Sequence, residues 1–214
     1  MIDPLLLTAL VASRVSHDLS ASITLVTTAM DFIDEPEDSP MRQEADNLLR
    51  SAATTGPAKV EFLRYAFGSQ GTSNTIADLH QAKKITEDYC AAHKHTVAWD
   101  ISASAVSFAH VRLAMQMMLL GLDALPKGGV IHIAIADDGP GLAFTVRAKG
   151  QRCRLTDPLL RGLKVEPPDD GWQAQNIQPV FAQMVAQSLG TSIAATQATE
   201  EEAVFQASGA RGAD

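Results

Sequence analysis

The sequence lacks the features that would place it in a membrane or outside the cell. Its longest apolar stretch, Leu113 to Leu122, contains a glutamine and is much shorter than the roughly 20 residues that a transmembrane helix needs. No basic region precedes the first apolar residues, so a secretory signal is not expected. Its two cysteines, Cys90 and Cys153, lie far apart without metal-type spacing, which favours reduced thiols over a disulfide framework. We therefore expect a cytoplasmic protein.

Positive charge is also scarce. The chain has 17 Lys and Arg residues against 25 Asp and Glu residues, a formal net charge of −8. Nucleic-acid binding depends on Lys and Arg side chains that neutralise phosphates, so a nucleic-acid partner is not expected. The chain is nevertheless 46% hydrophobic over 214 residues, enough for a real core. The expected partners are proteins or small molecules.

The first third of the chain predicts a helical hairpin. Between Leu5 and Ile33 there is neither proline nor glycine, and apolar residues recur at steps of three and four. An acidic turn at residues 34–40 follows, in which Ser39 can cap a second helix from Met41 to Phe67. Gly56-Pro57 predicts a kink or break in that second helix. Because such a hairpin buries only one seam, we expect a second copy to complete a four-helix bundle, making a homodimer.

A different pattern follows the Gly- and Ser-rich linker from Gly68 to Asn74. We expect residues 1–70 to form the hairpin domain and residues 71–214 to form a second domain of layered helices and strands, so the fold class is α+β. The predicted helices are 77–94, 107–125, 155–163 and 177–189, and the predicted strands are 95–101, 130–136, 142–148, 192–197 and 203–207.

His17 is the candidate nucleophile, and its position on the first helix decides whether it can react. Val15 and Leu19 lie one turn apart on one face, so at about 100° per residue His17 points about 200° away from them. It should face outward. Its neighbours at helical spacing are small or polar: Ser13, Arg14, Ser20, Ala21 and Thr24. A surface histidine without a function has the same pattern, so periodicity alone leaves both interpretations open.

The residue types around His17 suit phosphoryl transfer. Imidazole is a nucleophile when it is neutral, and the N–P bond that it forms keeps the phosphoryl group transferable. Such transfer needs mainly positioning and charge neutralisation, which a partner's metal ion can supply. Asp18 can hydrogen-bond a ring nitrogen and favour the reactive tautomer, and Arg14 can pair with acidic groups or phosphoryl oxygens. We expect Ser13, Arg14, Ala21 and Thr24 to pack around the active site of a partner.

The segment Ala12-Ser13-Arg14-Val15-Ser16-His17-Asp18-Leu19 resembles the phospho-acceptor motif of the ChpT family of histidine phosphotransferases, which are similar to the dimerisation and ATPase halves of bacterial sensor kinases. The likeness continues, in order and spacing, through residues 63–68, 125–129, 144–150 and 176–179. It implies a four-helix-bundle dimer flanked by two degenerate ATPase-like domains of the Bergerat type, with His17 phosphorylated and Asp18 beside it. The implied partners are receiver domains, one from a hybrid histidine kinase as donor and one from a response regulator as acceptor.

Two departures from the family pattern fall on the same helix. Family members follow the His-Asp pair with a Ser-Pro step and later Asn residues, whereas this chain has Ser20-Ala21-Ser22 and Thr27-Thr28 there. The surface that selects the partner therefore differs from the usual one.

A second motif, Asp137-Asp138-Gly139-Pro140-Gly141, satisfies the Asp-x-Gly-x-Gly pattern with which sensor-kinase ATPases hold adenine. The segment Phe108 to Leu125 contains no Asn to bind a metal ion, and a strand begins at Leu142 where a glycine-rich lid should follow. We favour a hairpin turn over residual nucleotide binding and expect no cofactor.

Cys90, His93 and His95 lack a fourth ligand, so no metal site is expected. Two other functions stay open for the chain: a non-catalytic scaffold that docks receiver domains, and an ATP-dependent histidine kinase.

Overall fold

The computed structural model describes residues 2–69, 73–92 and 94–211, and within them the chain forms six helices and a five-stranded sheet. The α+β class is confirmed, and each predicted helix and strand is present with its ends shifted by a few residues. The predicted domain boundary after residue 70 lies outside the described residues. The helices are α1 (Pro4–Met30), α2 (Pro40–Phe67), α3 (Leu79–Ala91), α4 (Phe108–Asp123), α5 (Asp157–Leu163) and α6 (Gln178–Ser188). The strands are β1 (His95–Ile101), β2 (Gly129–Asp138), β3 (Gly141–Lys149), β4 (Ala194–Thr199) and β5 (Glu202–Ala210).

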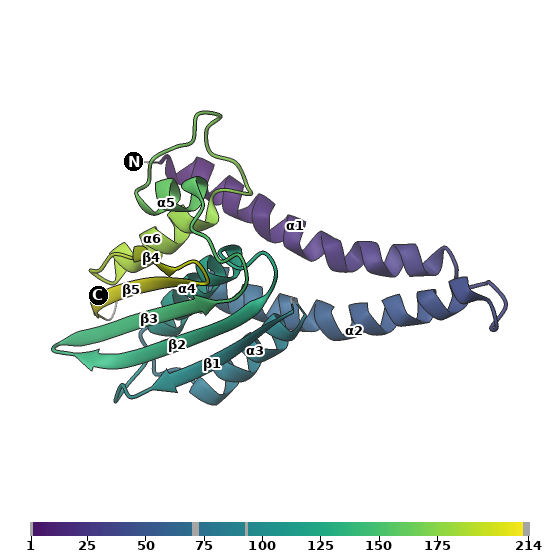
Figure 1. The fold of residues 1–214 in the computed structure, drawn as a ribbon, viewed down its shortest axis with the longest axis horizontal. Helices are drawn as coiled ribbons and strands as arrows, with labels where there is room; N and C mark the ends of the chain where they lie inside the picture. The colour runs from purple at the N-terminus through teal and green to yellow at the C-terminus, as the bar shows by residue number, and fades with distance from the viewer. Residues whose placement is uncertain (1, 70–72, 93, 212–214) are drawn as a thin grey trace.

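Helices α1 and α2 form a long hairpin that extends away from the rest of the chain (Figure 1). Each begins with a capping side chain followed by proline: Asp3 accepts a hydrogen bond from the amide of Leu6, and Ser39 accepts one from the amide of Met41. Of the kink or break expected at Gly56-Pro57, the break is wrong, because α2 is continuous through Pro57. Packing against α1 along the hairpin holds α2 together despite the one hydrogen bond that Pro57 cannot make.

The sheet has the order β1-β2-β3-β5-β4, with β1 parallel to β2 and the other pairs antiparallel. Asp138 pairs with Gly141, so Gly139 and Pro140 form the two-residue connection between β2 and β3. Gly139 has a φ of 59°, a conformation that suits glycine in such a tight turn. The hairpin expected at this motif is confirmed.

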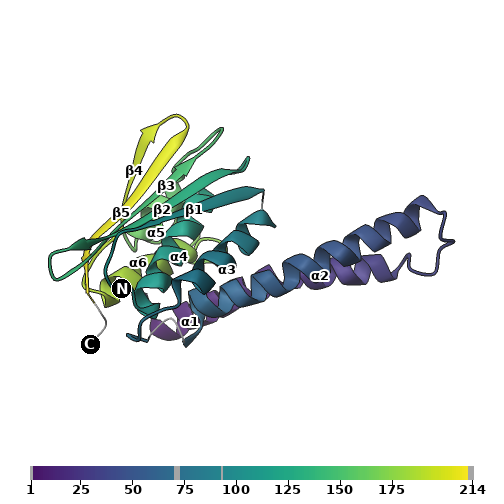
Figure 2. The ribbon, with the colours of Figure 1, turned by 90° about the horizontal axis from the view of Figure 1, so that it is seen from below.

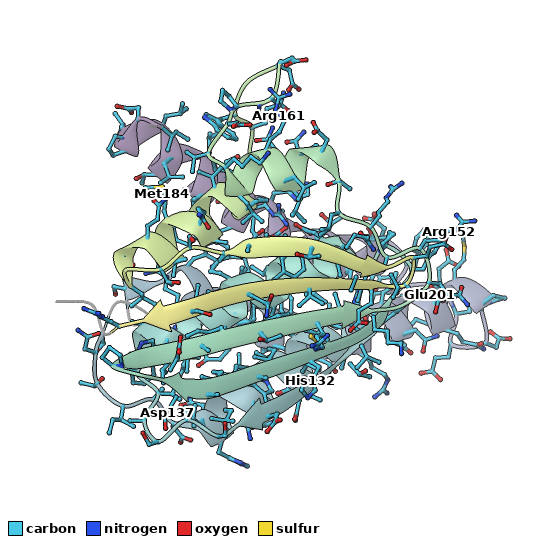
Figure 3. All side chains as sticks on the ribbon, turned by 60° about the vertical axis from the view of Figure 1, so that its left-hand side comes forward. His132, Asp137, Arg152, Arg161, Met184 and Glu201 are labelled. Carbon is cyan, nitrogen blue, oxygen red and sulfur yellow. The ribbon has the colours of Figure 1, made fainter. Side chains whose placement is uncertain are left out.

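Helices α3, α4 and α6 cover one face of the sheet, and the other face is open (Figure 2). His132 lies on the open face, while Asp137 and Glu201 lie at opposite ends of the sheet (Figure 3). The main core forms between the sheet and α4, which is buried along nearly all its length. Met115, Met117 and Met118 are fully buried there and form part of this core.

The sheet and helices α3 to α6 together are called the second unit. Arg112 and Gln116 of α4 join this second unit to the hairpin. Both side chains donate hydrogen bonds to the carbonyl of Ala66, and Arg112 also donates to the carbonyl of Phe67. These carbonyls end α2 and lack partners within the helix. These hydrogen bonds therefore fix the position of the C-terminal end of α2 relative to α4. Across the residues described above, no helix is both long and apolar enough to span a bilayer.

Candidate functional site

His17 lies near the middle of α1, and 85% of its side-chain surface is exposed. Val15 and Leu19, two residues away on either side, pack against the main core. The outward orientation expected from helical periodicity is therefore confirmed. The imidazole can be reached by another protein.

Asp18 is much less accessible than His17, since only 25% of its side chain is exposed. Its Oδ1 lies 3.8 Å from Nδ1 of His17, and its Oδ2 lies 3.2 Å from Nε of Arg14. The first distance is longer than a hydrogen bond but short enough for the carboxylate to attract a positively charged ring. Arg14 thus holds one carboxylate oxygen while the other faces the imidazole.

Arg14 lies between α1 and the second unit, and only 22% of its side chain is exposed. Its Nη1 donates a hydrogen bond of 3.4 Å to the carbonyl of Gln175, far away in the sequence. Sequence reasoning placed Arg14 on the partner-facing surface. In the structure its guanidinium also makes contacts within the chain, with Asp18 on one side and Gln175 on the other.

A pocket of about 410 Å³ opens beside His17. Its walls come from both parts of the chain: Ser13, Arg14 and His17 of α1, and Ala174 and Gln175 of the segment before α6. Sequence reasoning missed the last two residues, because no helical pattern shows that a distant segment packs against α1. The available signal was the length of the stretch between the predicted helices 155–163 and 177–189, since long loops in compact proteins are often functional.

The other predicted recognition residues are exposed but lie outside this pocket. Ala21 and Thr24 are on the same helix, further toward its C-terminus. The hydroxyl of Thr24 donates to the carbonyl of Ser20, and that of Ser20 donates to the carbonyl of Ser16. The exposed surface of α1 around His17 is therefore small and polar, without a bulky side chain of its own.

A second pocket, of about 260 Å³ and lined by charged residues, lies between the hairpin and the second unit. Arg14 and Asp18 line it together with Lys59 of α2, Tyr89 of α3 and Asp123 at the end of α4. Burial raises the pKa of Tyr89, so its hydroxyl stays protonated. The Arg14–Asp18 pair thus borders a pocket that is lined by residues of four helices.

The carboxylates of the Asp-x-Gly-x-Gly motif are engaged within the chain. Asp137 accepts hydrogen bonds from the amide and hydroxyl of Ser104, and Asp138 accepts one from the amide of Gly209. Asp137 thus holds the loop that follows β1, and Asp138 holds the end of β5. This arrangement favours the hairpin-turn interpretation over a site for adenine.

Within the described residues, neither the cysteines nor the described part of the Cys90–His93–His95 cluster forms a nucleophilic or metal-binding site. Burial raises the pKa of the Cys90 thiol to about 12, so it stays protonated beside Met118. His93, one member of the weak Cys90–His93–His95 cluster, lies outside the described residues. Among those described, no three His, Cys, Asp or Glu side chains gather closely enough to hold a metal ion.

Three comparisons with known proteins agree that this chain is similar to phosphotransferases. The family model for the histidine phosphotransferase C-terminal domain matches residues 79–201. The protein phosphotransferase ChpT of Brucella abortus (strain 2308) is 25% identical over 199 residues, which are 93% of this chain and 93% of that protein. A solved structure of a bacterial phosphotransferase is 26% identical, superposes with a TM-score of 0.85, and matches over 97% of this chain and 98% of its own.

Proposed function

This chain belongs to the histidine phosphotransferase family, so its general activity is phosphoryl transfer, and we propose that His17 is the residue that carries the phosphoryl group. The donor in this proposal is the phosphorylated aspartate of a receiver domain in a hybrid histidine kinase. The acceptor is the aspartate of a response regulator. The observation that carries the proposal is the exposed imidazole of His17 with the carboxylate of Asp18 3.8 Å from its Nδ1.

The chemistry follows from this geometry. Nδ1 of His17 faces Asp18, which leaves Nε2 free toward the solvent for attack on phosphorus. The N–P bond forms as the bond between phosphorus and the receiver's carboxylate oxygen breaks, and the carboxylate leaves with the electron pair. The ring gains positive charge in this step, and the Asp18 carboxylate stabilises that charge. Transfer to the second receiver reverses the same step.

We propose that the phosphoryl group does not come from ATP. The Asp137 carboxylate, which would have to bind adenine, is already engaged by Ser104. Helix α4 has no asparagine for a metal ion, and only two residues separate β2 from β3, which leaves no room for a lid. The metal ion that neutralises the transferring phosphoryl group would be the one bound by the receiver.

The apolar surface of the hairpin supports the proposal that two copies form a four-helix bundle. Ile23, Val26, Met30 and Val60 are large apolar side chains that remain exposed. Two apolar hollows of about 480 and 300 Å³ run along α1 and α2 and share Leu19 and Val60. A second hairpin would cover this stripe. Residues 1–70 would then act as the dimerisation and transfer domain, and residues 71–214 as the degenerate ATPase-like domain.

We propose that the receiver docks on the exposed face of α1. Ser13, Ala21 and Thr24 are small enough to let a bulky acidic active site approach His17, and Ser13 lies in the pocket beside it. Arg14 borders the same pocket and, in this proposal, adds positive charge to its rim.

Mapping of the phosphoryl group tests the proposal. The protein would be incubated with a phosphorylated receiver domain and digested at neutral pH, and the modified residue would be identified by mass spectrometry. We expect modification at His17 alone among the six histidines. His80→Ala, which removes an exposed histidine of α3, should leave the modification in place, whereas a group found on another residue would refute the proposal.

A further inference from the structure

We propose that Arg14 is a positioning residue that fastens the α5–α6 segment (residues 164–177) beside His17, so that the receiver-docking site is built from both parts of the chain. The role of this contact in transfer rests on the proposed function. The fastening itself does not, because it is a property of the free protein.

The α5–α6 segment has a defined shape that its own side chains maintain. Arg161 of α5 donates to the carbonyl of Pro167 and to the carboxylate of Asp169. Near the other end, Asn176 accepts a hydrogen bond from the amide of Gln173 and donates one to the carbonyl of Gly171. The segment therefore has a fixed shape and can form one wall of the pocket beside His17.

Two interactions hold this wall beside α1. Trp172 packs against a small buried cluster formed by Ile2, Ile177 and Val180, and residues of α1 pack against the same cluster: Leu7, Leu10 and Val11. One turn further along α1, Nη1 of Arg14 donates to the carbonyl of Gln175 over 3.4 Å. The segment lies beside the N-terminal half of α1 (Figure 1). Apolar packing holds the segment close, and the arginine bond sets where Ala174 and Gln175 stand relative to His17.

Arginine is suited to this position because one planar group makes two directed contacts. Nε binds the carboxylate of Asp18 at 3.2 Å while Nη1 binds the carbonyl of Gln175. Lysine carries the same charge on a compact head without the fork, so it cannot hold both groups in the same way. A single residue thus orients the Asp18 carboxylate and locates the wall of the pocket.

This arrangement predicts where the effect of losing Arg14 will fall. Without the guanidinium, Ala174 and Gln175 lose their fixed position, and the pocket of about 410 Å³ beside His17 loses a defined wall. The receiver then meets a less ordered surface, so docking weakens more than the chemical step. We expect the KM for the phosphorylated receiver to rise about tenfold, which is the effect that losing a hydrogen bond to a charged group typically has on binding.

Fluorescence of Trp172 tests the fastening without any partner. The chain has two tryptophans, so Trp99→Phe leaves Trp172 as the only reporter. In that background we expect Arg14→Met to shift the emission of Trp172 to longer wavelength and to increase its quenching by acrylamide, with Arg14→Lys between the two. Arg50→Met, which removes an exposed arginine of α2, should leave both signals unchanged.

Hydrogen exchange on the chain with both tryptophans present provides the second measurement. Amides of residues 166–176 should exchange faster in Arg14→Met, while those of α4 keep their protection. Unchanged Trp172 emission and unchanged exchange would overturn the proposal, whatever happens to transfer. A fall in the transfer rate at saturating receiver with an unchanged KM would also overturn it, because Arg14 would then act on the reacting atoms. If no receiver phosphorylates the wild type, the proposed function fails while the fluorescence still decides the fastening.

Discussion

His17 and Asp18 are adjacent in the chain, yet 85% of one side chain is exposed and 25% of the other, with Nδ1 and Oδ1 3.8 Å apart. Arg14 forms an ion pair with Asp18, so the carboxylate is oriented before any partner binds. A phosphocarrier needs this combination. The nucleophile must reach another protein, while the group that stabilises its charge must stay in place.

Replacement of Asp18 by asparagine should slow transfer from a phosphorylated receiver to His17 by about 10- to 100-fold, toward the low end of what a positioned charged group contributes. Asparagine keeps the shape of the side chain but not its charge, so docking should change little. The rate is measured by rapid quench at saturating receiver. Glu44→Gln, an exposed acid of α2, is the control, and an Asp18→Asn rate equal to that of the wild type would remove Asp18 from the mechanism.

The proposed dimer predicts that charge on the apolar stripe separates the copies. Ile23→Glu or Val60→Glu places a carboxylate in the hollow of about 300 Å³ between α1 and α2 and should convert the dimer to monomers in sedimentation experiments. Val130→Glu is the matched control, because Val130 is an exposed valine on β2 in the second unit. A monomeric wild type, or dimers in all three variants, would contradict the bundle.

Arg112 should contribute to stability rather than to transfer. Arg112→Met keeps the apolar stem but leaves the carbonyl of Phe67 without its donor, since Arg112 binds it at 3.3 Å. We expect the free energy of unfolding in urea to fall by about 1–3 kcal/mol. Arg154→Met, at an exposed arginine, should change it by less than about 0.5 kcal/mol. Equal stability of the two variants would show that the joint between α2 and α4 does not depend on Arg112.

His110 should make stability depend on pH. Burial lowers its pKa below the ordinary value of 6.5, because the charged ring would lose its hydration. The unfolded chain therefore takes up a proton at higher pH than the folded chain. As a result, the free energy of unfolding falls as the pH drops through about 6.5 and keeps falling until the lowered pKa is reached.

His110→Gln tests this dependence, because glutamine does not titrate and can still complete the capping box with Ser107. Between pH 7 and 5 the variant should lose less of its melting temperature than the wild type. His80→Gln, at an exposed histidine, should follow the wild type. A steeper loss in His110→Gln would contradict the assigned direction of the pKa shift.

Much of the fold could be predicted because local patterns and tertiary packing agree. The step from Val15 to Leu19 places His17 outward, and Asp138 to Gly141 has the residues of a tight hairpin turn. Pro57 misled the prediction because local propensity argues for a break, whereas packing against α1 keeps the helix whole. Gln175 itself could not be identified from the sequence, although the long stretch between the predicted helices 155–163 and 177–189 marks the segment that contains it. It joins the site through its backbone carbonyl, which any residue carries, and through a contact between segments far apart in the chain.

The most direct test of the account follows acid-labile phosphate on the purified protein over time. Wild type, His17→Ala and His80→Ala would each be incubated with a panel of phosphorylated receiver domains, and separately with ATP and Mg²⁺ alone. We expect label from at least one receiver in the wild type and in His80→Ala, none in His17→Ala, and none from ATP. Label from ATP alone would contradict the proposal that the phosphoryl group does not come from ATP. Label that persists in His17→Ala, or no label from any receiver, would contradict the assignment of His17 as the phosphoryl carrier.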